Sequence, residues 1–270
     1  TAARLRLHGS AGASPCRHCN WPLATLAPTG YRLFFGGAMA PSLLLAWVGG
    51  WLVRRNAPGW GLVDRPDTPH KGHAEPTPLG GGLAIALAVV LPLLVGQILL
   101  MRIESPAGLF GFQPPEFIAL HAAGFLSQMM KLWTVLIAAV VLMTIGLIDD
   151  ARGLPWPVRL TAQFIVAGVV VWLWDWELTA FVPFKLASQL LAVVWIVGLI
   201  NAFNMLDNMD GLSAGVATIC AGALVMVLIA SPDPATGQPQ LFVIGFLLVL
   251  IGALIGFLIH NTPPAKLFMG

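Results

Sequence analysis

Charged residues are scarce in this chain, and they are absent from its longest apolar stretches. Only 10% of the 270 residues are Asp, Glu, Lys or Arg, whereas 57% are hydrophobic, and the mean hydropathy is +0.83. Soluble domains carry about 25% charged residues. The scarcity of charge therefore excludes an ordinary soluble domain and predicts an integral membrane protein.

Cysteine is also rare, with only Cys16, Cys19 and Cys220 in the chain. Three cysteines do not supply a disulfide framework. Cys16 and Cys19 form a lone CxxC without a second ligand pair, so we expect an irregular tail over residues 1–32 and no zinc site there. Cys220 lies inside an apolar run, where we expect it to act as a small apolar residue.

Seven runs of 15 to 23 residues contain no charged residue at all. They are residues 33–53, 79–101, 132–148, 160–174, 186–200, 212–230 and 241–259. A membrane helix needs about 20 apolar residues, so we expect the short fifth run to begin near Phe181, with Lys185 reaching the interface. The predicted fold is an all-α, polytopic helical bundle of about seven transmembrane helices over residues 33–270.

The distribution of cations predicts the orientation of these helices. The loops that share one side hold seven cations: Arg54, Arg55, Arg65, Lys71, Arg152, Arg159 and Lys266. The opposite loops hold three: Arg102, Lys131 and Lys185. The positive-inside bias makes the first side cytoplasmic and places the N-terminus outside, in an inner (plasma) membrane, although four arginines in the tail 1–32 would even this count.

The stretch 201–212 places two amides and two carboxylates between two apolar runs. Its polar residues are Asn201, Asn204, Asp207 and Asp210, three positions apart. Each step of three residues turns an ideal helix by about 300°, so one straight helix does not point all four side chains inward. We expect the membrane helix to end near Asn201, with a tight turn from Asn204 to Asp210 and Gly211 returning the chain to the bilayer.

Two further groups of polar residues belong to the same predicted membrane surface. Asp149 and Asp150 end the third apolar run, where adjacent carboxylates need a cation, a metal or full solvation; Arg152 is one candidate partner. Lys71, with His70 or His73, either approaches an anionic substrate or serves only to fix the orientation of the helices in the membrane. Carboxylates and amides beside cations suit Mg²⁺ with a diphosphate substrate, because Mg²⁺ binds one or two carboxylates plus phosphate oxygens.

Five ordered segments resemble the polyprenyl-phosphate N-acetylhexosamine-1-phosphate transferases, the family of the MraY, WecA and TagO enzymes. The matching segments are residues 61–66, 70–81, 146–150, 201–212 and 264–270. The resemblance implies transfer of a sugar-1-phosphate from a UDP-sugar donor to undecaprenyl phosphate, a polyprenyl phosphate lipid, with release of UMP and dependence on Mg²⁺, with Mn²⁺ as the alternative ion. We expect membrane lipid around the protein, no nucleic-acid partner, and a homodimer as one possible assembly.

The same resemblance assigns roles residue by residue. Asp149 and Asp150 match paired aspartates at the catalytic centre. Asp207 matches an active-site carboxylate, and Asn204 matches an amide near the metal, so both are expected metal neighbours. The implied substrate-binding residues are Lys71, His73, Asn201, Asp210 and Lys266. Asn208 stands where the family usually has glycine, and asparagine tolerates positive φ better than other non-glycine residues.

The motifs at 76–81 and 201–204 favour the WecA and TagO branch, and so favour UDP-N-acetylglucosamine as donor for the first membrane step of cell-envelope polysaccharide synthesis. The alternatives are an MraY-type phospho-N-acetylmuramoyl-pentapeptide transferase, an ion-coupled transporter and a non-catalytic scaffold. The charge-free runs carry no acid at the midplane, which disfavours transport. In the family an aspartate follows the position of Gly270, so we expect a C-terminally truncated chain that is inactive alone.

Overall fold

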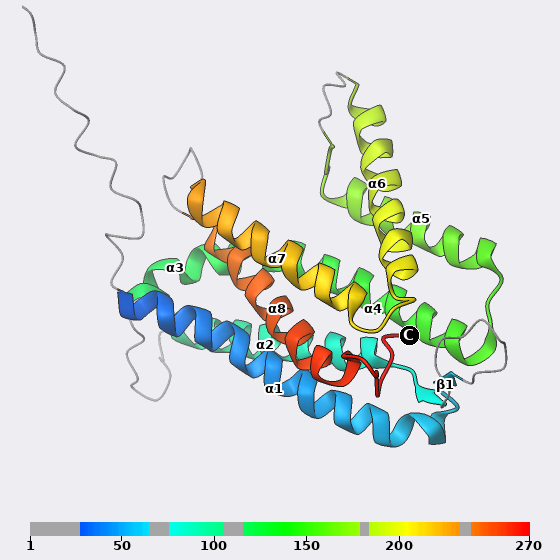
Figure 1. The fold of residues 1–270 in the computed structure, drawn as a ribbon. Coiled ribbons are helices and arrows are strands. Elements are labelled where there is room, and N and C mark those ends of the chain that lie inside the picture. Colours follow the sequence, from blue (N-terminus) through cyan, green and yellow to red (C-terminus); the bar gives the residue numbers. More distant parts are fainter. Residues whose placement is uncertain (1–27, 65–75, 105–115, 179–183, 233–238) are drawn as a thin grey trace, which may run out of the picture.

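The computed structural model describes residues 28–64, 76–104, 116–178, 184–232 and 239–270. These residues form a helical bundle with one two-stranded ribbon. In chain order the elements are α1 (Pro28–Trp60), β1 (Val63–Asp64), β2 (Thr77–Pro78), α2 (Gly81–Glu104), α3 (Glu116–Ser127), α4 (Met129–Arg152), α5 (Trp156–Leu173), α6 (Lys185–Leu206), α7 (Leu212–Ala230) and α8 (Leu241–Asn261). Figure 1 shows their arrangement.

Seven of the helices are long and apolar enough to cross a membrane, namely α1, α2, α4, α5, α6, α7 and α8. The prediction of a polytopic all-α membrane protein with about seven spanning helices is confirmed. Many large apolar side chains on the outer faces are exposed, among them Trp51, Leu87 and Ile219. In a membrane protein such faces meet lipid, which is as apolar as the side chains themselves.

The boundaries differ from the predictions in three places, the first being α1, which begins at Pro28 inside the predicted irregular tail 1–32. α6 begins at Lys185, and its continuation to Leu206 makes Asn201 and Asn204 helical, so the predicted helix end near Asn201 is wrong. The sequence alone also did not predict the short helix α3, which precedes α4. The error at α6 arose from treating polar residues as a break, although amides lining a cavity leave backbone hydrogen bonds of a helix intact.

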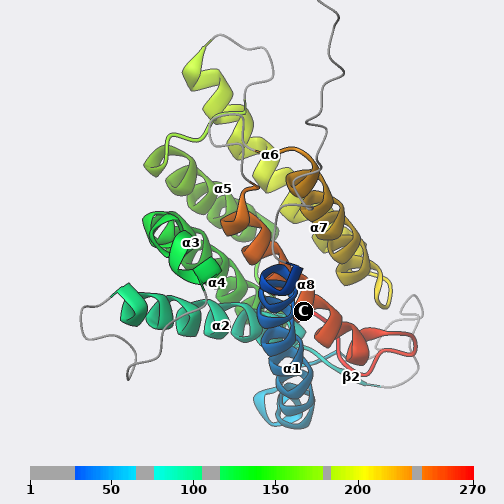
Figure 2. The same cartoon turned by 90° about the vertical axis from the view of Figure 1, so that its left-hand side faces the viewer.

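Helix α8 is the central helix of the bundle. It is far more buried than the other six candidate spans. In its apolar stretch 61% of the residues are buried, against 11–28% in the corresponding stretches of the other helices. It packs against α1, α2 and α7, and Figure 2 shows α2 and α7 on its two sides. The buried residues Val249, Ala253 and Leu254 of α8 belong to two core clusters that it shares with α1 and α2.

Small residues allow α8 to approach α1 closely. Gly252 and Gly256, four residues apart, lie against the backbone carbonyls of Met39 and Leu43 in α1. A Cβ atom at Gly256 would also stand 2.8 Å from the Cβ of Ala46. This is the spacing by which membrane helices bring their backbones together.

The loops at one end of the bundle are joined by backbone hydrogen bonds. β1 and β2 pair antiparallel, with Val63 opposite Pro78. The C-terminal segment then adds to β2, because the Phe268 N–H donates to the Pro78 carbonyl (2.9 Å) and the Gly81 N–H donates to the Phe268 carbonyl (2.9 Å). The segments that contain residues 76–81 and 264–270 are therefore held side by side at the end of α4 and α6.

Candidate active site

The candidate site is a cavity of about 760 Å³ that opens between α2, α4, α5, α6 and α8. Its polar lining residues lie at the loop end of the bundle, and Figure 1 marks the C-terminus there, close to the ends of α4 and α6. The polar side chains that line it are Asp149, Asp150, Arg159, Gln163, Asn201, Asn204, Asp207 and Ser213. The structure thus brings together the polar residues that follow the third and fifth apolar runs. Successive spanning helices alternate in direction, which predicts that both groups lie at the same end of the bundle.

The negative charge of Asp149, in the last turn of α4, is neutralised by an ion pair. Its Oδ1 accepts a hydrogen bond from the Leu154 backbone N–H (2.6 Å), and its Oδ2 accepts one from Nη1 of Arg159 (2.6 Å). The ion-pair partner is Arg159, in the first turn of α5, and not the predicted Arg152. Gly153, in a left-handed conformation, ends α4 and lets the chain turn into α5. The ion pair between Asp149 and Arg159 connects the two helices across this turn.

Asp150 has a different environment from its neighbour. Within the described part of the chain it forms no salt bridge, and its carboxylate lines the cavity. It lies beside Gly270, since a Cβ atom built on Gly270 would stand 2.5 Å from Oδ2 of Asp150. Two adjacent aspartates therefore have different surroundings, one paired with a guanidinium and one open to the cavity.

Asp207 lies immediately after α6 and contributes the second open carboxylate. Burial raises the pKa of Asp207 to about 6, and the negative charge of Asp150 adds to this rise. Asp150 and Asp207 come from different helices yet are close enough to repel one another. A site that holds two such carboxylates without a described cation between them favours binding of a cation.

The residue set at the polar end suits a hard divalent ion. Asp150, Asp207 and Asn204 line the cavity together and offer carboxylate and amide oxygens. The described residues contain no cluster of three His, Cys, Asp or Glu side chains, so these residues supply fewer ligands than a closed metal cage. Mg²⁺ binds in this manner, through one or two carboxylates with waters and substrate phosphates completing its shell.

Asn201 faces the cavity but is engaged in holding two helices together. Its Nδ2 donates to Oε1 of Gln163 in α5 (2.6 Å) and to the Val197 carbonyl one turn earlier in α6 (2.8 Å). Gln163 was not recognised from the sequence. A single polar residue inside an apolar run was the signal that could have found it, because such residues in membrane helices usually face a cavity or a partner.

Asp210 does not line the cavity. Its Oδ2 accepts a hydrogen bond from the backbone N–H of Ala265 (2.9 Å), which ties the loop after α6 to the loop after α8. The expectation that one straight helix does not point all four polar residues inward therefore holds, since Asp210 lies beyond the helix end. Asn208 does not take the positive φ suggested for it; Gly211 does, with φ 72°, while Asn208 donates to the Met205 carbonyl.

Of the other predicted substrate-binding residues, Lys266 is described by the structure and lies outside the cavity. The Lys266 side chain is exposed and outside the lining set, and its backbone N–H donates to the His260 carbonyl (2.8 Å). Lys71 and His73 lie outside the described residues, so their roles stay predictions.

Asn261, at the end of α8, is a site-supporting residue that sequence reasoning missed. Its side chain is buried, with 3% exposure, and its Oδ1 accepts the Gly211 N–H (2.9 Å) while its Nδ2 donates to the Leu267 carbonyl (2.9 Å). The signal was its position at the start of a proline-containing loop on the predicted active face. Buried amides of this kind are fully hydrogen-bonded and fix local geometry.

Away from the carboxylates the cavity becomes apolar. It continues between α2, α4 and α8 along Val89, Leu136, Val140, Met143 and Leu250. Leu136 precedes Asp150 by fourteen residues on α4, a distance of about 21 Å along the helix. The cavity therefore joins an anionic, cation-attracting end to a long apolar wall within the membrane-spanning region.

The fold and site define a multi-pass membrane protein whose polar centre lies where four loops meet at one end of the bundle. The model of glycosyl transferase family 4 matches residues 132–270, which include the whole polar end described above. The chain belongs to this family.

Three relatives give the family context. Decaprenyl-phosphate N-acetylglucosaminephosphotransferase of Mycobacterium tuberculosis is 32% identical over 73% of this chain and 46% of its own length. A probable undecaprenyl-phosphate N-acetylglucosaminyl 1-phosphate transferase of Bacillus subtilis is 28% identical over 86% and 57%. Phospho-N-acetylmuramoyl-pentapeptide-transferase of Lactiplantibacillus plantarum is 30% identical over 90% and 68%. The chain thus spans about half the length of the first two relatives.

Proposed function

We propose that this chain forms the active site of a phosphoglycosyl transferase, which moves a sugar-1-phosphate from a UDP-amino sugar to a polyprenyl phosphate and releases UMP. The observation that carries this proposal is the pair of open carboxylates, Asp150 and Asp207, at the polar end of a cavity whose other end is apolar. One cavity then accommodates a charged diphosphate and a lipid chain. The membrane position of the site fits an acceptor that does not leave the bilayer.

The proposed metal is Mg²⁺, with Mn²⁺ as a substitute. Asp207 and Asn204 would hold it, and Asp150 would lie beside it. When bound, the ion supplies charge neutralisation for the diphosphate, whose reaction depends on positioning and electrostatics more than on a strong protein nucleophile. The fit rests on the donor set of an amide and two carboxylates that form no ion pair with any described residue, which matches the oxygen preference of Mg²⁺.

In the proposed reaction an oxygen of the polyprenyl phosphate attacks the phosphorus that carries the sugar. A new P–O bond forms there, the bond from that phosphorus to the bridging oxygen breaks, and its electron pair leaves with UMP. Asp150 and Asp207 would attract and hold the cation, whose positive charge would offset their repulsion of the substrate phosphates. Asp149 serves the reaction by holding Arg159 and the start of α5 in place.

The apolar wall supports a lipid acceptor. With its phosphate at the carboxylates, a polyprenyl chain would run about 21 Å along α4 to Leu136 before leaving the cavity. An isoprenoid chain forms no hydrogen bonds, and the apolar side chains on this wall have no groups that need hydrogen-bond partners. An ion path would instead carry polar groups across the bilayer midplane, so the apolar wall disfavours the transporter alternative.

The favoured donor is UDP-N-acetylglucosamine, because the M. tuberculosis and B. subtilis relatives are named for N-acetylglucosamine transfer. The L. plantarum relative keeps the phospho-N-acetylmuramoyl-pentapeptide reaction as a second candidate. We further propose an inner-membrane location with the site on the cytoplasmic face. A homodimer remains an untested expectation.

The test measures UMP release and radiolabelled lipid product by a purified longer chain that includes residues 1–270, with undecaprenyl phosphate and Mg²⁺. We expect product from UDP-N-acetylglucosamine, and none after removal of divalent ions with EDTA. Product only from UDP-N-acetylmuramoyl-pentapeptide would favour the second candidate, the phospho-N-acetylmuramoyl-pentapeptide reaction. Absence of product from both donors would overturn the proposal. The expectation that residues 1–270 alone are inactive is checked by the same assay beside a longer chain.

A further inference from the structure

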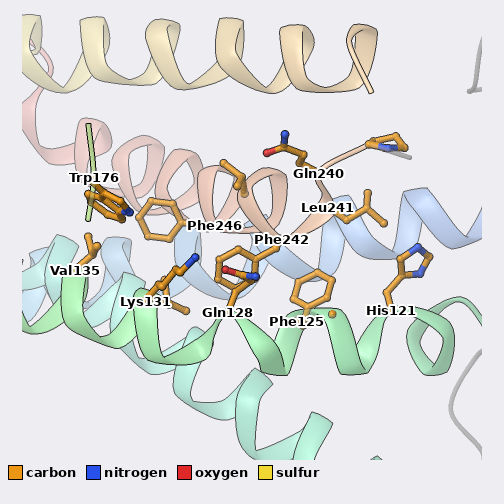
Figure 3. A pocket seen from close by; sticks show the side chains of 14 residues that line it. His121, Phe125, Gln128, Lys131, Val135, Trp176, Gln240, Leu241, Phe242 and Phe246 are labelled. Atoms are coloured by element: carbon orange, nitrogen blue, oxygen red, sulfur yellow. The ribbon is translucent and has the colours of Figure 1, made fainter. Parts of the chain in front are cut away.

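A second cavity, of about 780 Å³, lies between α3, α4 and the start of α8. Figure 3 shows its side chains, with Lys131 and Phe125 rising from α4 and α3 toward Phe242 and Phe246 of α8. Trp176, from the segment after α5, closes one side. Its size falls in the range of about 300–1,000 Å³ that small-molecule sites occupy.

The chemistry of this cavity is apolar and aromatic with one positive charge. Its aromatic lining includes Phe125, Trp176, Phe242 and Phe246. Lys131 is the one Lys or Arg among the described residues that line it, and none of them is a carboxylate. The amide of Gln128 lies beside Lys131, and Gln128 and Gln240 both line the cavity and add hydrogen-bond donors.

Asp175, which follows the Trp174 that Lys131 contacts, is paired with other side chains. Asp175 accepts hydrogen bonds from Nζ of Lys185 and, at 2.7 Å, from Nε2 of Gln189. Lys131 itself lies over the ring of Trp174, 5.8 Å from its centroid, which leaves the ammonium group without a described anionic partner. A ligand that complements the cavity therefore carries a negative charge next to an apolar body.

The cavity lies at the membrane end opposite the carboxylate site. Lys131 precedes Asp150 by nineteen residues on the same straight helix α4, which corresponds to about 28 Å. This is close to the thickness of the hydrocarbon core, about 30 Å. Lys131 is thus at the depth of the phosphate groups of one leaflet, while the aromatic residues lie next to its acyl chains.

We propose that this cavity binds an anionic phospholipid of the leaflet opposite the carboxylate site. The phosphate pairs with Lys131 and accepts hydrogen bonds from Gln128, and an acyl chain lies among Phe125, Phe242 and Phe246. A zwitterionic lipid offers the same chains but brings its own cation beside Lys131. This site is independent of the proposed transferase reaction.

The first test is native mass spectrometry of the purified protein in detergent with phosphatidylglycerol or phosphatidylcholine of identical acyl chains. We expect the protein to retain phosphatidylglycerol preferentially, and Lys131→Gln to reduce that preference about fivefold, the usual contribution of one lysine near an anionic lipid. Arg102→Gln, an exposed cation at the end of α2 outside the cavity, is the matched control. Equal retention of both lipids by the wild type, or the same loss in Arg102→Gln, would overturn the proposal.

The second test fills the cavity without changing charge. Gly124 lines it, and a Cβ atom there would meet no atom within 4 Å, so Gly124→Leu extends into open space and favours the helix. We expect this variant to lose phosphatidylglycerol adducts while Gly96→Leu, at an equally open helical position in α2, keeps them. Unchanged adducts in Gly124→Leu would show that lipid binds elsewhere.

Discussion

Asn261 accepts a hydrogen bond from the backbone N–H of Gly211, a residue fifty positions earlier in the chain, at 2.9 Å. The same side chain donates to the Leu267 carbonyl, so one buried amide connects the loop after α6 with the loop after α8. Asp207 lies in the first of these loops, and Gly270, which touches Asp150, ends the second. The carboxylate site therefore depends on an uncharged residue that does not line it.

Asn261→Ala should reduce turnover at least tenfold and lower the melting temperature. The substitution leaves two buried backbone groups unpaired, at a cost of about 1–3 kcal/mol each. UMP release and thermal unfolding of the purified protein check this. Asn208→Ala, which removes an exposed hydrogen bond in the same loop, should behave nearly as the wild type. Comparable losses in both variants would contradict the role of Asn261 as a brace.

Asp150→Asn and Asp207→Asn should each lower turnover by about 10²-fold or more while the protein still folds. Each change removes a charge where the transferred phosphoryl group is expected to react, and such preorganised groups supply several kcal/mol to the transition state. Size-exclusion profiles and UMP release are the measurements. Asp175→Asn applies the same change at the other membrane face and should leave turnover intact. Wild-type rates in either site variant would remove that residue from the catalytic set.

Metal binding should weaken as the pH falls below 6. The pKa of Asp207 is raised to about 6, so this carboxyl is protonated in acid and must release its proton to bind a cation. Affinity for Mn²⁺, measured by electron paramagnetic resonance without turnover, should fall about tenfold per pH unit well below 6 and level off above about 7. In Asp207→Asn binding should be weak and should depend less steeply on pH, because Asp150 remains as the second open carboxylate of the site. An affinity that does not change between pH 5 and 7 would exclude Asp207 as a ligand.

Gly256→Ala should destabilise the bundle, because the added methyl group meets the Leu43 backbone and stands 2.8 Å from the Cβ of Ala46. Overpacking of this kind costs about 1–3 kcal/mol. Thermal unfolding in detergent measures the loss. Gly222→Ala, in α7 with no atom within 4 Å of the added carbon, is the matched control and should keep or raise the melting temperature. Equal stability of the two variants would argue against close α1–α8 packing.

The sequence by itself determined the class of fold and the end of the bundle at which the candidate site lies. Long charge-free runs leave only membrane helices as a solution for the backbone, because unpaired N–H and C=O groups are too costly in lipid. Successive spanning helices run in opposite directions, which places Asp149, Asp150 and Asp207 at the same end of the bundle. In the structure all three line one cavity.

Only the tertiary structure decided which helix is central and which polar residues are open to a ligand. α8 is the most apolar span, but nothing local distinguishes an apolar helix that faces lipid from one that faces protein; the close approach of Gly252 and Gly256 to α1 settles it. Likewise Asp149 and Asp150 are neighbours of identical type, and they differ because Arg159 of α5 reaches one of them and not the other. Pairing between helices depends on their relative positions, which a linear sequence does not specify.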